Sequence, residues 1–389
     1  MNQATRWWIA GAVIALCVTF GIFVQTEPVN VSRGIDTAAG VADAASSSDG
    51  TASAAEAAIR EGLEAIGFVG VPEHVTTSLA TLERVDDYPV YTMRYVGPYV
   101  RASELERVTS PDPEENAYEV GQDESWACSL FAAVGDPEHA VLGRNFDWEY
   151  SPILVVFLEP EEGYTSVMSI DIAYLIEPEW IDDLDEAPVE QRLALLSAPF
   201  LTFDGMNEKG LAIGMASVDY ECGYSSDPDK RDVGDLRLMR EVLESSASVE
   251  EALTFLEGIN PVSQGGPNTH YLVADRTGAA LIEYHEGEMY VFRSREETPW
   301  QLGTNFPVVL TEDEPIGHCW RYDRIETTLR AAAGVLSTAE AAELLQNVST
   351  PMTRWSIVYD LAAVEMHLVI ERDSETVHTF SLGEDTSRP

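Results

Sequence analysis

The sequence is poor in basic residues. Its 389 residues include 23 Lys and Arg against 67 Asp and Glu, a formal net charge of −44, and the only lysines are Lys209 and Lys230. Such a charge repels phosphates, so we expect neither a nucleic acid nor an anionic membrane surface as a partner. Hydrophobic residues make up 45% of the chain. That content supplies a core and excludes an acidic disordered protein.

The acidic excess itself predicts a salt-adapted (halophilic) protein. Like charges repel one another in dilute buffer, and salt weakens this repulsion because it shortens the Debye length to about 3 Å at 1 M. A cation-binding protein is the alternative, but acidic runs such as 182–186 lack the glycine and the alternating ligands of a calcium loop. We therefore expect folding and activity to depend on concentrated salt.

Cysteine is also scarce. The chain has four, and only Cys128, Cys222 and Cys319 lie outside the apolar segment near the N-terminus. This number gives no disulfide framework, although a single Cys222–Cys319 bridge is conceivable and leaves Cys128 as a free thiol. The sequence has no Cys-x-x-Cys, no His-x-x-x-His and no other metal-ligand spacing. We therefore expect no metal and no cofactor.

One long apolar run lies near the N-terminus. Residues 7–24 are uncharged and mainly apolar, follow Arg6, and reach the length of a membrane span. No small-x-small cleavage site follows, so residues 1–28 are predicted to be a membrane anchor or uncleaved signal, with the body of the protein outside the cell. A cleaved signal and a secreted protein are the alternative. Residues 29–57, rich in Ala, Ser, Gly and Asp, are predicted to be a flexible tether.

Residues 58–127 are predicted to be an N-terminal extension that resembles a propeptide. Strand-like runs at 82–85 and 91–96, separated by a turn at 86–89, indicate a hairpin within it. The stretch 111–124 is acidic and irregular, as expected for an exposed approach to the residues that follow.

Beyond this extension the pattern alternates between strands and helices. The capping-box pairs Ser248–Glu251 and Ser337–Glu340 mark the starts of two helices. Hairpins are predicted at 153–170 and 201–217, a helical block from about 236 with a further helix that starts at Ser248, a second helix pair at about 320–348, and further strands at 269–275, 280–284, 289–293, 355–360, 365–370 and 377–382. Antiparallel sheets separated by helix pairs fit two sheets sandwiched between helical layers, an α+β fold.

A cysteine opens the most informative segment. Cys128 begins an apolar strand that ends in a turn at 135–138, and a second strand, 140–148, returns beside it. Such a hairpin allows Arg144 and Asp147 to approach the Cys128 thiol. On these residues alone, Cys128 could equally be a small buried hydrophobe and Arg144–Asp147 a surface ion pair, since free cysteine is among the most buried residue types.

Residues 128–148 resemble the start of the mature chain in the family of penicillin V acylases and conjugated bile acid hydrolases, which also includes acid ceramidase and N-acylethanolamine acid amidase. In these N-terminal-nucleophile (Ntn) hydrolases of linear amides, Arg follows the catalytic Cys at plus sixteen and Asp at plus nineteen, as Arg144 and Asp147 do here. The resemblance extends over about residues 125–383. Further matching segments follow in chain order at 203–211, 270–275, 304–306, 321–324 and 355–360.

The resemblance implies an αββα four-layer sandwich, with two mainly antiparallel sheets between helical layers and residues 128–389 as the catalytic domain. It also implies cleavage of the Ala127–Cys128 bond. The freed α-amine, with a reference pKa of about 7.7–8.0, then takes the thiol proton. In this scheme Asp147 orients the amine, while Arg144 lowers the thiol pKa and helps to fix the acyl carbonyl.

Two further catalytic residues are implied by the same resemblance. Asn305 matches the family's oxyanion-hole Asn, and Arg321 fits its second catalytic Arg better than Arg324 does. From the residues alone, Asn305 could be a turn residue and Arg321 the start of a solvated helix. Bile acid hydrolases carry an Asn ten residues beyond the position of Asn207, where this chain has Ser217. This departure weakens any claim to bile-salt or penicillin specificity and makes Ser217 a candidate substrate-binding residue.

These observations predict a cysteine amidase that hydrolyses linear N-acyl amides through a thioester. One alternative is an acyltransferase of the same fold, which passes the thioester to an amine. Another is a non-catalytic, salt-adapted envelope-binding module, in which Cys128 stays unreactive within the chain. If Cys128 instead acts from within an uncleaved chain, a histidine must serve as its base, and His270 is the first candidate.

Overall fold

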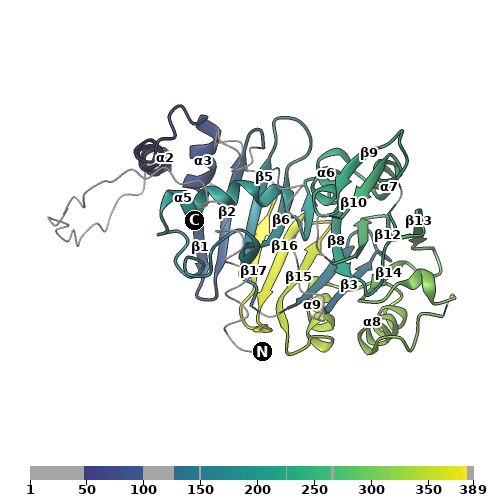
Figure 1. Ribbon diagram of the computed structural model, residues 1–389. Helices are drawn as coiled ribbons and strands as arrows, with labels where there is room; N and C mark the ends of the chain where they lie inside the picture. The colour runs from purple at the N-terminus through teal and green to yellow at the C-terminus, as the bar shows by residue number, and fades with distance from the viewer. Residues whose placement is uncertain are drawn as a thin grey trace, which may run out of the picture.

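The computed structural model describes residues 48–99, 127–148, 150–224, 226–263, 267–312 and 314–382. Two large sheets form its centre, and helices cover their outer faces (Figure 1). The four-layer α+β architecture expected from the sequence is therefore confirmed.

The six-stranded sheet carries the cysteine hairpin and is antiparallel throughout. Cys128 lies near the start of its second strand, and the predicted return strand pairs with it. In spatial order the strands are β14 (Trp300–Gly303), β3 (Ala127–Ala133), β4 (Val141–Asp147), β15 (Thr353–Asp360), β16 (Glu365–Ile370) and β17 (His378–Ser381).

The nine-stranded sheet faces it and is antiparallel except for the pairing of β2 with β5. Its strands, in spatial order, are β1 (Glu83–Asp86), β2 (Val90–Val96), β5 (Ile153–Glu159), β6 (Ser166–Asp171), β7 (Asp204–Asn207), β8 (Ala212–Ser217), β11 (Thr269–Asp275), β12 (Gly278–His285) and β13 (Glu288–Arg293). A separate parallel pair, β9 (Arg231–Gly234) with β10 (Ile259–Val262), was not predicted.

Two helix pairs complete the sandwich. Helices α6 (Arg237–Ser245) and α7 (Val249–Glu257) pack on the nine-stranded sheet, and α8 (Trp320–Ala331) and α9 (Thr338–Asn347) pack on the six-stranded sheet. In Figure 1 the first pair lies above the sheets and the second below them. Short helical segments occur at α5 (Val189–Arg192), η1 (Ile172–Tyr174), η2 (Leu193–Phe200) and η3 (Val308–Leu310).

The two predicted helix caps differ in detail. Ser337 and Glu340 form a complete capping box at the start of α9. Ser248 caps α7 through the main-chain N–H of Glu251, but the Glu251 carboxylate accepts a hydrogen bond from the N–H of Ala247, at 2.8 Å, instead of from Ser248. The predicted box at Ser248 is therefore only half formed.

The N-terminal extension is built into the nine-stranded sheet. Helices α2 (Ser48–Ala65) and α3 (Glu73–Ala80) precede the predicted hairpin, which is confirmed as β1 and β2. Strand β2 pairs in parallel with β5 along its whole length. Eight apolar side chains of the extension are at most 4% exposed: Ile59, Leu63, Val75, Leu79, Val90, Tyr91, Met93 and Tyr95.

The predicted flexible tether was wrong at its C-terminal end. Residues 48–57 belong to helix α2, because this stretch is rich in alanine, the best helix former. The helix then buries Ile59 and Leu63, which are four residues apart and share one face. The predicted membrane segment, residues 29–47 and the acidic stretch 111–124 lie outside the described residues. Among the described helices, none is long and apolar enough to cross a membrane.

Candidate active site around Cys128

Cys128 is buried near the start of β3, with 1% of its surface exposed. The β3–β4 register places it opposite Phe146 and places Ala127 opposite Asp147. Burial raises the pKa of the Cys128 thiol, while the positive charges of Arg144 and Arg321 act in the opposite direction. A thiol in this position needs a nearby base if it is to react as a thiolate.

Arg144 is fully buried and held on two sides. Its Nε donates to the main-chain oxygen of Met215 at 3.2 Å, and its Nη1 forms a hydrogen-bonded ion pair with the Asp204 carboxylate. Asp204 in turn accepts hydrogen bonds from the hydroxyls of Ser169, at 2.6 Å, and Tyr359. The Nη2 of Arg144 has no hydrogen-bond partner in the described part of the chain. The guanidinium therefore has one buried NH2 group that makes no hydrogen bond to the described residues.

Asn305 and Arg321 meet at the start of β3. The Oδ1 of Asn305 accepts from the Cys128 N–H at 2.7 Å and from Arg321 Nη2 at 2.8 Å. Arg321 Nη1 also donates to the Cys128 main-chain oxygen and to the Ser129 hydroxyl. Since two donors point at Oδ1, the Asn305 amide must direct its NH2 group the other way. That group donates to the main-chain oxygen of Ser217, at 2.9 Å, and to its hydroxyl, at 3.0 Å.

Asp147 lies at the end of β4, next to the same cluster. Its Oδ1 accepts from the Thr353 hydroxyl at 2.5 Å, and its Oδ2 lies 3.9 Å from Arg321 Nη1. Oδ2 makes no hydrogen bond to any described residue. Burial raises the pKa of Asp147 to about 6, although Thr353, Arg321 and Arg144 all act to lower it. Asp147 is therefore a buried carboxylate with one oxygen free of hydrogen bonds to the described residues, on the strand position opposite Ala127.

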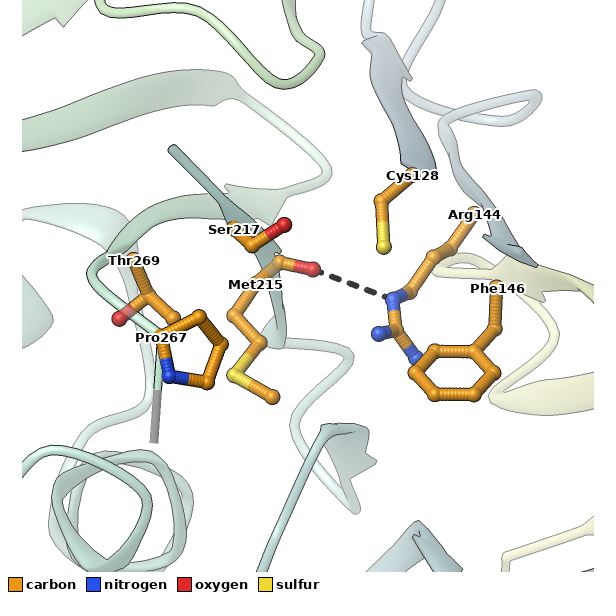
Figure 2. A pocket seen from close by; sticks show the side chains of 7 residues that line it. All are labelled: Cys128, Arg144, Phe146, Met215, Ser217, Pro267 and Thr269. Carbon is orange, nitrogen blue, oxygen red and sulfur yellow. Dashed lines mark hydrogen bonds between the residues drawn. The ribbon is translucent and has the colours of Figure 1, made fainter. Parts of the chain in front are cut away.

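A small pocket opens at the cysteine (Figure 2). Its volume is about 10 Å³, room for about one water molecule and far less than the roughly 300–1,000 Å³ typical of small-molecule sites. Figure 2 shows the Cys128 sulfur directed into the space between Arg144 on one side and Met215 and Ser217 on the other. The lining residues are Cys128, Arg144, Phe146, Met215, Ser217, Pro267 and Thr269.

The structure brings together all the residues singled out from the sequence: Cys128, Arg144, Asp147, Ser217, Asn305 and Arg321. Arg144 and Asp147 are both buried and do not form a surface ion pair; Arg144 pairs with Asp204 instead. Of the two candidate arginines on α8, Arg321 faces Cys128, whereas Arg324 is exposed.

The structure also shows where the other residues considered from the sequence lie. His270 is fully buried and bonded to Glu283, and does not line the pocket. Cys222 and Cys319 are both free thiols, so the conceivable bridge between them is absent. Within the described residues, no three His, Cys, Asp or Glu side chains lie close enough together to hold a metal ion.

Sequence reasoning missed Asp204, the partner that holds Arg144. The sequence did contain a clue to it, because a charged residue lies between Phe203 and Gly205 in a segment that was expected to form a hairpin. A carboxylate in such a strand is almost never fully buried unless it is paired, so a cationic partner could have been sought.

Comparisons with known proteins agree with this geometry. Residues 128–298 match the family described as linear amide C–N hydrolases, choloylglycine hydrolase family. A mutant of conjugated bile acid hydrolase from Clostridium perfringens is similar in structure, with a TM-score of 0.50 and 16% sequence identity over 67% of this chain and 94% of that one. No curated relative matches the chain in sequence.

Two other solved structures are similar at lower scores. Penicillin V acylase from Agrobacterium tumefaciens is 20% identical over 66% of this chain and 87% of its own, with a TM-score of 0.45. The Caenorhabditis elegans N-acylethanolamine-hydrolyzing acid amidase ortholog is 13% identical over 60% of this chain and 93% of its own, with a TM-score of 0.42. With the fold and the sequence match taken together, this chain resembles the Ntn linear amide C–N hydrolases and is a hydrolase of carbon–nitrogen bonds in linear amides.

Proposed function

We propose that this chain is a cysteine amidase that hydrolyses linear N-acyl amides through a thioester on Cys128, after cleavage of its own Ala127–Cys128 bond. The observation that carries the proposal is the convergence of Arg144, Asp147, Asn305 and Arg321 on one buried thiol and on its peptide nitrogen. In this proposal the catalytic domain is residues 128–389.

The first step converts the peptide nitrogen of Cys128 into an amine. The Cys128 sulfur attacks the carbonyl carbon of Ala127, a carbon–sulfur bond forms, the carbon–nitrogen bond breaks, and the thiol proton moves to the departing nitrogen. Water then hydrolyses this thioester, which leaves a carboxylate on Ala127 and a free thiol and α-amine on Cys128. The Oδ1 of Asn305 already accepts a hydrogen bond from that nitrogen, and Asp147 lies opposite Ala127 in the strand register.

Turnover uses the same sulfur. The α-amine takes the thiol proton, and the thiolate attacks the acyl carbon of the substrate. The leaving amine then takes the proton, and water hydrolyses the acyl thioester. Arg144 supports the thiolate by its charge, and its unused Nη2 donor is available to the acyl oxygen.

Asn305 is the proposed oxyanion donor. Because Oδ1 already accepts two hydrogen bonds, the orientation of the side-chain amide is fixed. Its NH2 group can therefore donate a hydrogen bond to a developing negative charge without first turning. Two contacts with Ser217 now occupy that group. We propose that the substrate carbonyl oxygen replaces one of these two acceptors when substrate binds. Ser217 then lies at the substrate-binding position and accepts both hydrogen bonds from Asn305 only while the site is empty.

The lining of the pocket indicates the acyl side of the substrate. Apart from Arg144, its contributions come mainly from Phe146, Met215, Pro267 and the methyl group of Thr269. An apolar acyl group fits such a surface better than a charged one, because burying an unpaired charge there is costly.

We also propose that residues 1–28 attach the enzyme to a membrane, with the catalytic domain outside the cell. The apolar run at 7–24 and the preceding Arg6 support this proposal. The net charge of −44 supports adaptation to concentrated salt.

The test replaces Cys128 by Ala and, separately, by Ser. Cys128→Ala should abolish both chain cleavage and turnover of a panel of N-acyl amides in concentrated salt. Cys128→Ser should retain some cleavage and lose most turnover. The matched control is Cys319→Ala, a free thiol outside the pocket, which should leave both reactions intact. Full amidase activity in Cys128→Ala would refute the proposal.

Trapping distinguishes hydrolysis from acyl transfer. With hydroxylamine present, an acyl thioester yields a hydroxamate. In water alone, a hydrolase should release the free acid at a comparable rate, whereas an acyltransferase needs an added amine to turn over. The absence of hydroxamate in an active preparation would remove the thioester from the mechanism.

A further inference from the structure

A buried His–Glu pair lies between the two sheets and has no part in the chemistry above. His270 on β11 and Glu283 on β12 are both fully buried, with Nδ1 and Oε1 2.9 Å apart. His270 Nε2 has no hydrogen-bond partner among the described residues. Such a pair, far from solvent and without a catalytic contact, calls for a structural explanation.

The carboxylate of Glu283 binds the segment that follows Asn305. Its Oε1 accepts from the N–H of Val308 at 2.9 Å, and its Oε2 accepts from the N–H of Val309 at 2.8 Å. Glu283 therefore joins β12 to the first residues of η3 through two main-chain hydrogen bonds.

The ring of His270 supports the segment that precedes Asn305. It packs against Gly303 so closely that a Cβ atom there would lie 3.0 Å from Nε2 and 3.0 Å from Leu281 Cδ1. Because glycine has no Cβ, strand β14 ends directly against the histidine ring. One member of the pair thus supports residue 303, while the other binds residues 308 and 309.

Asn305 lies within the short stretch between these two attachments. An oxyanion donor must hold its position to within about 0.5 Å to be effective. The contacts of Asn305 with Cys128, Arg321 and Ser217 fix its amide, but they do not fix the main chain that carries it. The His270–Glu283 pair is placed to do so.

We propose that His270 and Glu283 are positioning residues that hold the main chain of Asn305 at the oxyanion site, an inference that rests on the proposed function. They touch neither the nucleophile nor the pocket and act only through residues 303–309. Their removal should therefore lower the rate of the chemical step and leave substrate binding nearly unchanged.

The test is Glu283→Gln, which keeps the shape and replaces one acceptor oxygen by an NH2 group. We expect kcat to fall by about 10-fold or more, less than the roughly 10²–10³-fold typical of losing an oxyanion donor outright, with KM within about twofold. In an Asn305→Ala background the same substitution should have no further effect on kcat, since the donor it positions is gone.

The matched control is Asp275→Asn. Asp275 is also a buried strand carboxylate that accepts main-chain N–H groups, from Val249 at 2.7 Å and Thr277 at 2.7 Å. It lies at the other end of β11, roughly 20 Å from the pocket end at about 3.4 Å per residue. This variant should keep its kcat even where its thermal midpoint falls as far as that of Glu283→Gln.

A second variant covers the case in which Glu283→Gln does not fold. Gly303→Ala adds one methyl group against the His270 ring and should lower kcat with the same dependence on Asn305. The inference is overturned if Glu283→Gln, or Gly303→Ala where Glu283→Gln does not fold, keeps the wild-type kcat. It is also overturned if the variant lowers kcat by the same factor in the wild-type and the Asn305→Ala backgrounds. Full activity in Asn305→Ala alone would instead refute the proposed role of Asn305.

Discussion

Asp171 should make the stability of this protein fall as the pH rises from about 4 to 7. It ends β6 and is 1% exposed. One oxygen accepts from the N–H of Ala173 at 2.9 Å, and the other has no hydrogen-bond partner among the described residues. Burial raises the pKa of this carboxyl to about 7, although Ala173 and the neighbouring Ser151 hydroxyl act to lower it. The folded protein thus favours the neutral acid.

The size of the effect follows from that shift. In the unfolded chain the pKa of Asp is about 3.9. Below pH 4 the acid is neutral in both states and carries no penalty. Between pH 4 and 7 only the unfolded chain ionises freely, so the folded state loses stability, and above pH 7 the loss is complete. Three pKa units correspond to at most about 4 kcal/mol at roughly 1.4 kcal/mol each.

Asp171→Asn removes the titration and keeps the shape. The amide oxygen retains the Ala173 contact, and the NH2 group can donate to Ser151. We expect equal stability at pH 4 and a gain of up to about 4 kcal/mol at pH 8, or roughly 5 °C in the melting midpoint of a chain this long. Urea unfolding across this range, in the uncleaved Cys128→Ala background at constant salt, measures the difference.

A control separates the titration from the simple change of side chain. Ser166, on the same strand, is a buried residue whose side chain does not titrate in this range, so the stability effect of Ser166→Ala should not depend on pH. A stability difference for Asp171→Asn that stays constant from pH 4 to 8, or that favours the wild type at pH 8, would refute the reasoning.

Four further outcomes are expected. Asp147→Asn should fold but lower kcat more than it changes KM, and should abolish the acid limb of the rate profile near the pKa of about 6; an unchanged profile would remove Asp147 from the site. Asp204→Asn should leave the Arg144 cation unpaired and cost about 3–5 kcal/mol in chemical denaturation, together with a large loss in kcat/KM; wild-type values for both would contradict the role of the pair. After cleavage at Ala127, the two chains should elute together in size-exclusion chromatography and separate on a denaturing gel, since eight buried apolar side chains at about 1.5–3 kcal/mol each hold the extension in place; separate native peaks would contradict this. Melting midpoints should rise with salt concentration, and equal midpoints in dilute and concentrated salt would refute the halophilic interpretation.

Local sequence patterns predicted the elements of this fold well. The two strands around the turn at 135–138 and the hairpin at 82–96 both carry strand residues on either side of turn residues, and the structure contains both. The pairing of β2 with β5 had no such signal. It joins strands more than fifty residues apart in parallel, and nothing in either strand alone specifies that partner.

For the candidate site, too, residues close to Cys128 in sequence were predicted and some of the residues distant from it were missed. Fixed spacing from Cys128 identified Arg144 and Asp147, because both lie on the strand that returns beside it. Asp204 and Glu283 were missed because they act through contacts between segments distant in sequence. His270 was considered as a base because histidine commonly serves as one; its burial against Gly303 and Glu283, which supports the positioning role proposed above, could not be read from the sequence.

The parallel pairing of β2 with β5 affects whether the enzyme can refold after it has unfolded. Before cleavage, the sheet belongs to one chain and can re-form after unfolding in a first-order reaction. Once the bond before Cys128 is cut, the same sheet spans two chains, and re-forming it requires them to meet in solution. Recovery then depends on concentration, and in dilute solution loss of structure is effectively one-way. Cleavage would thus activate the enzyme and at the same time limit it to a single folding event.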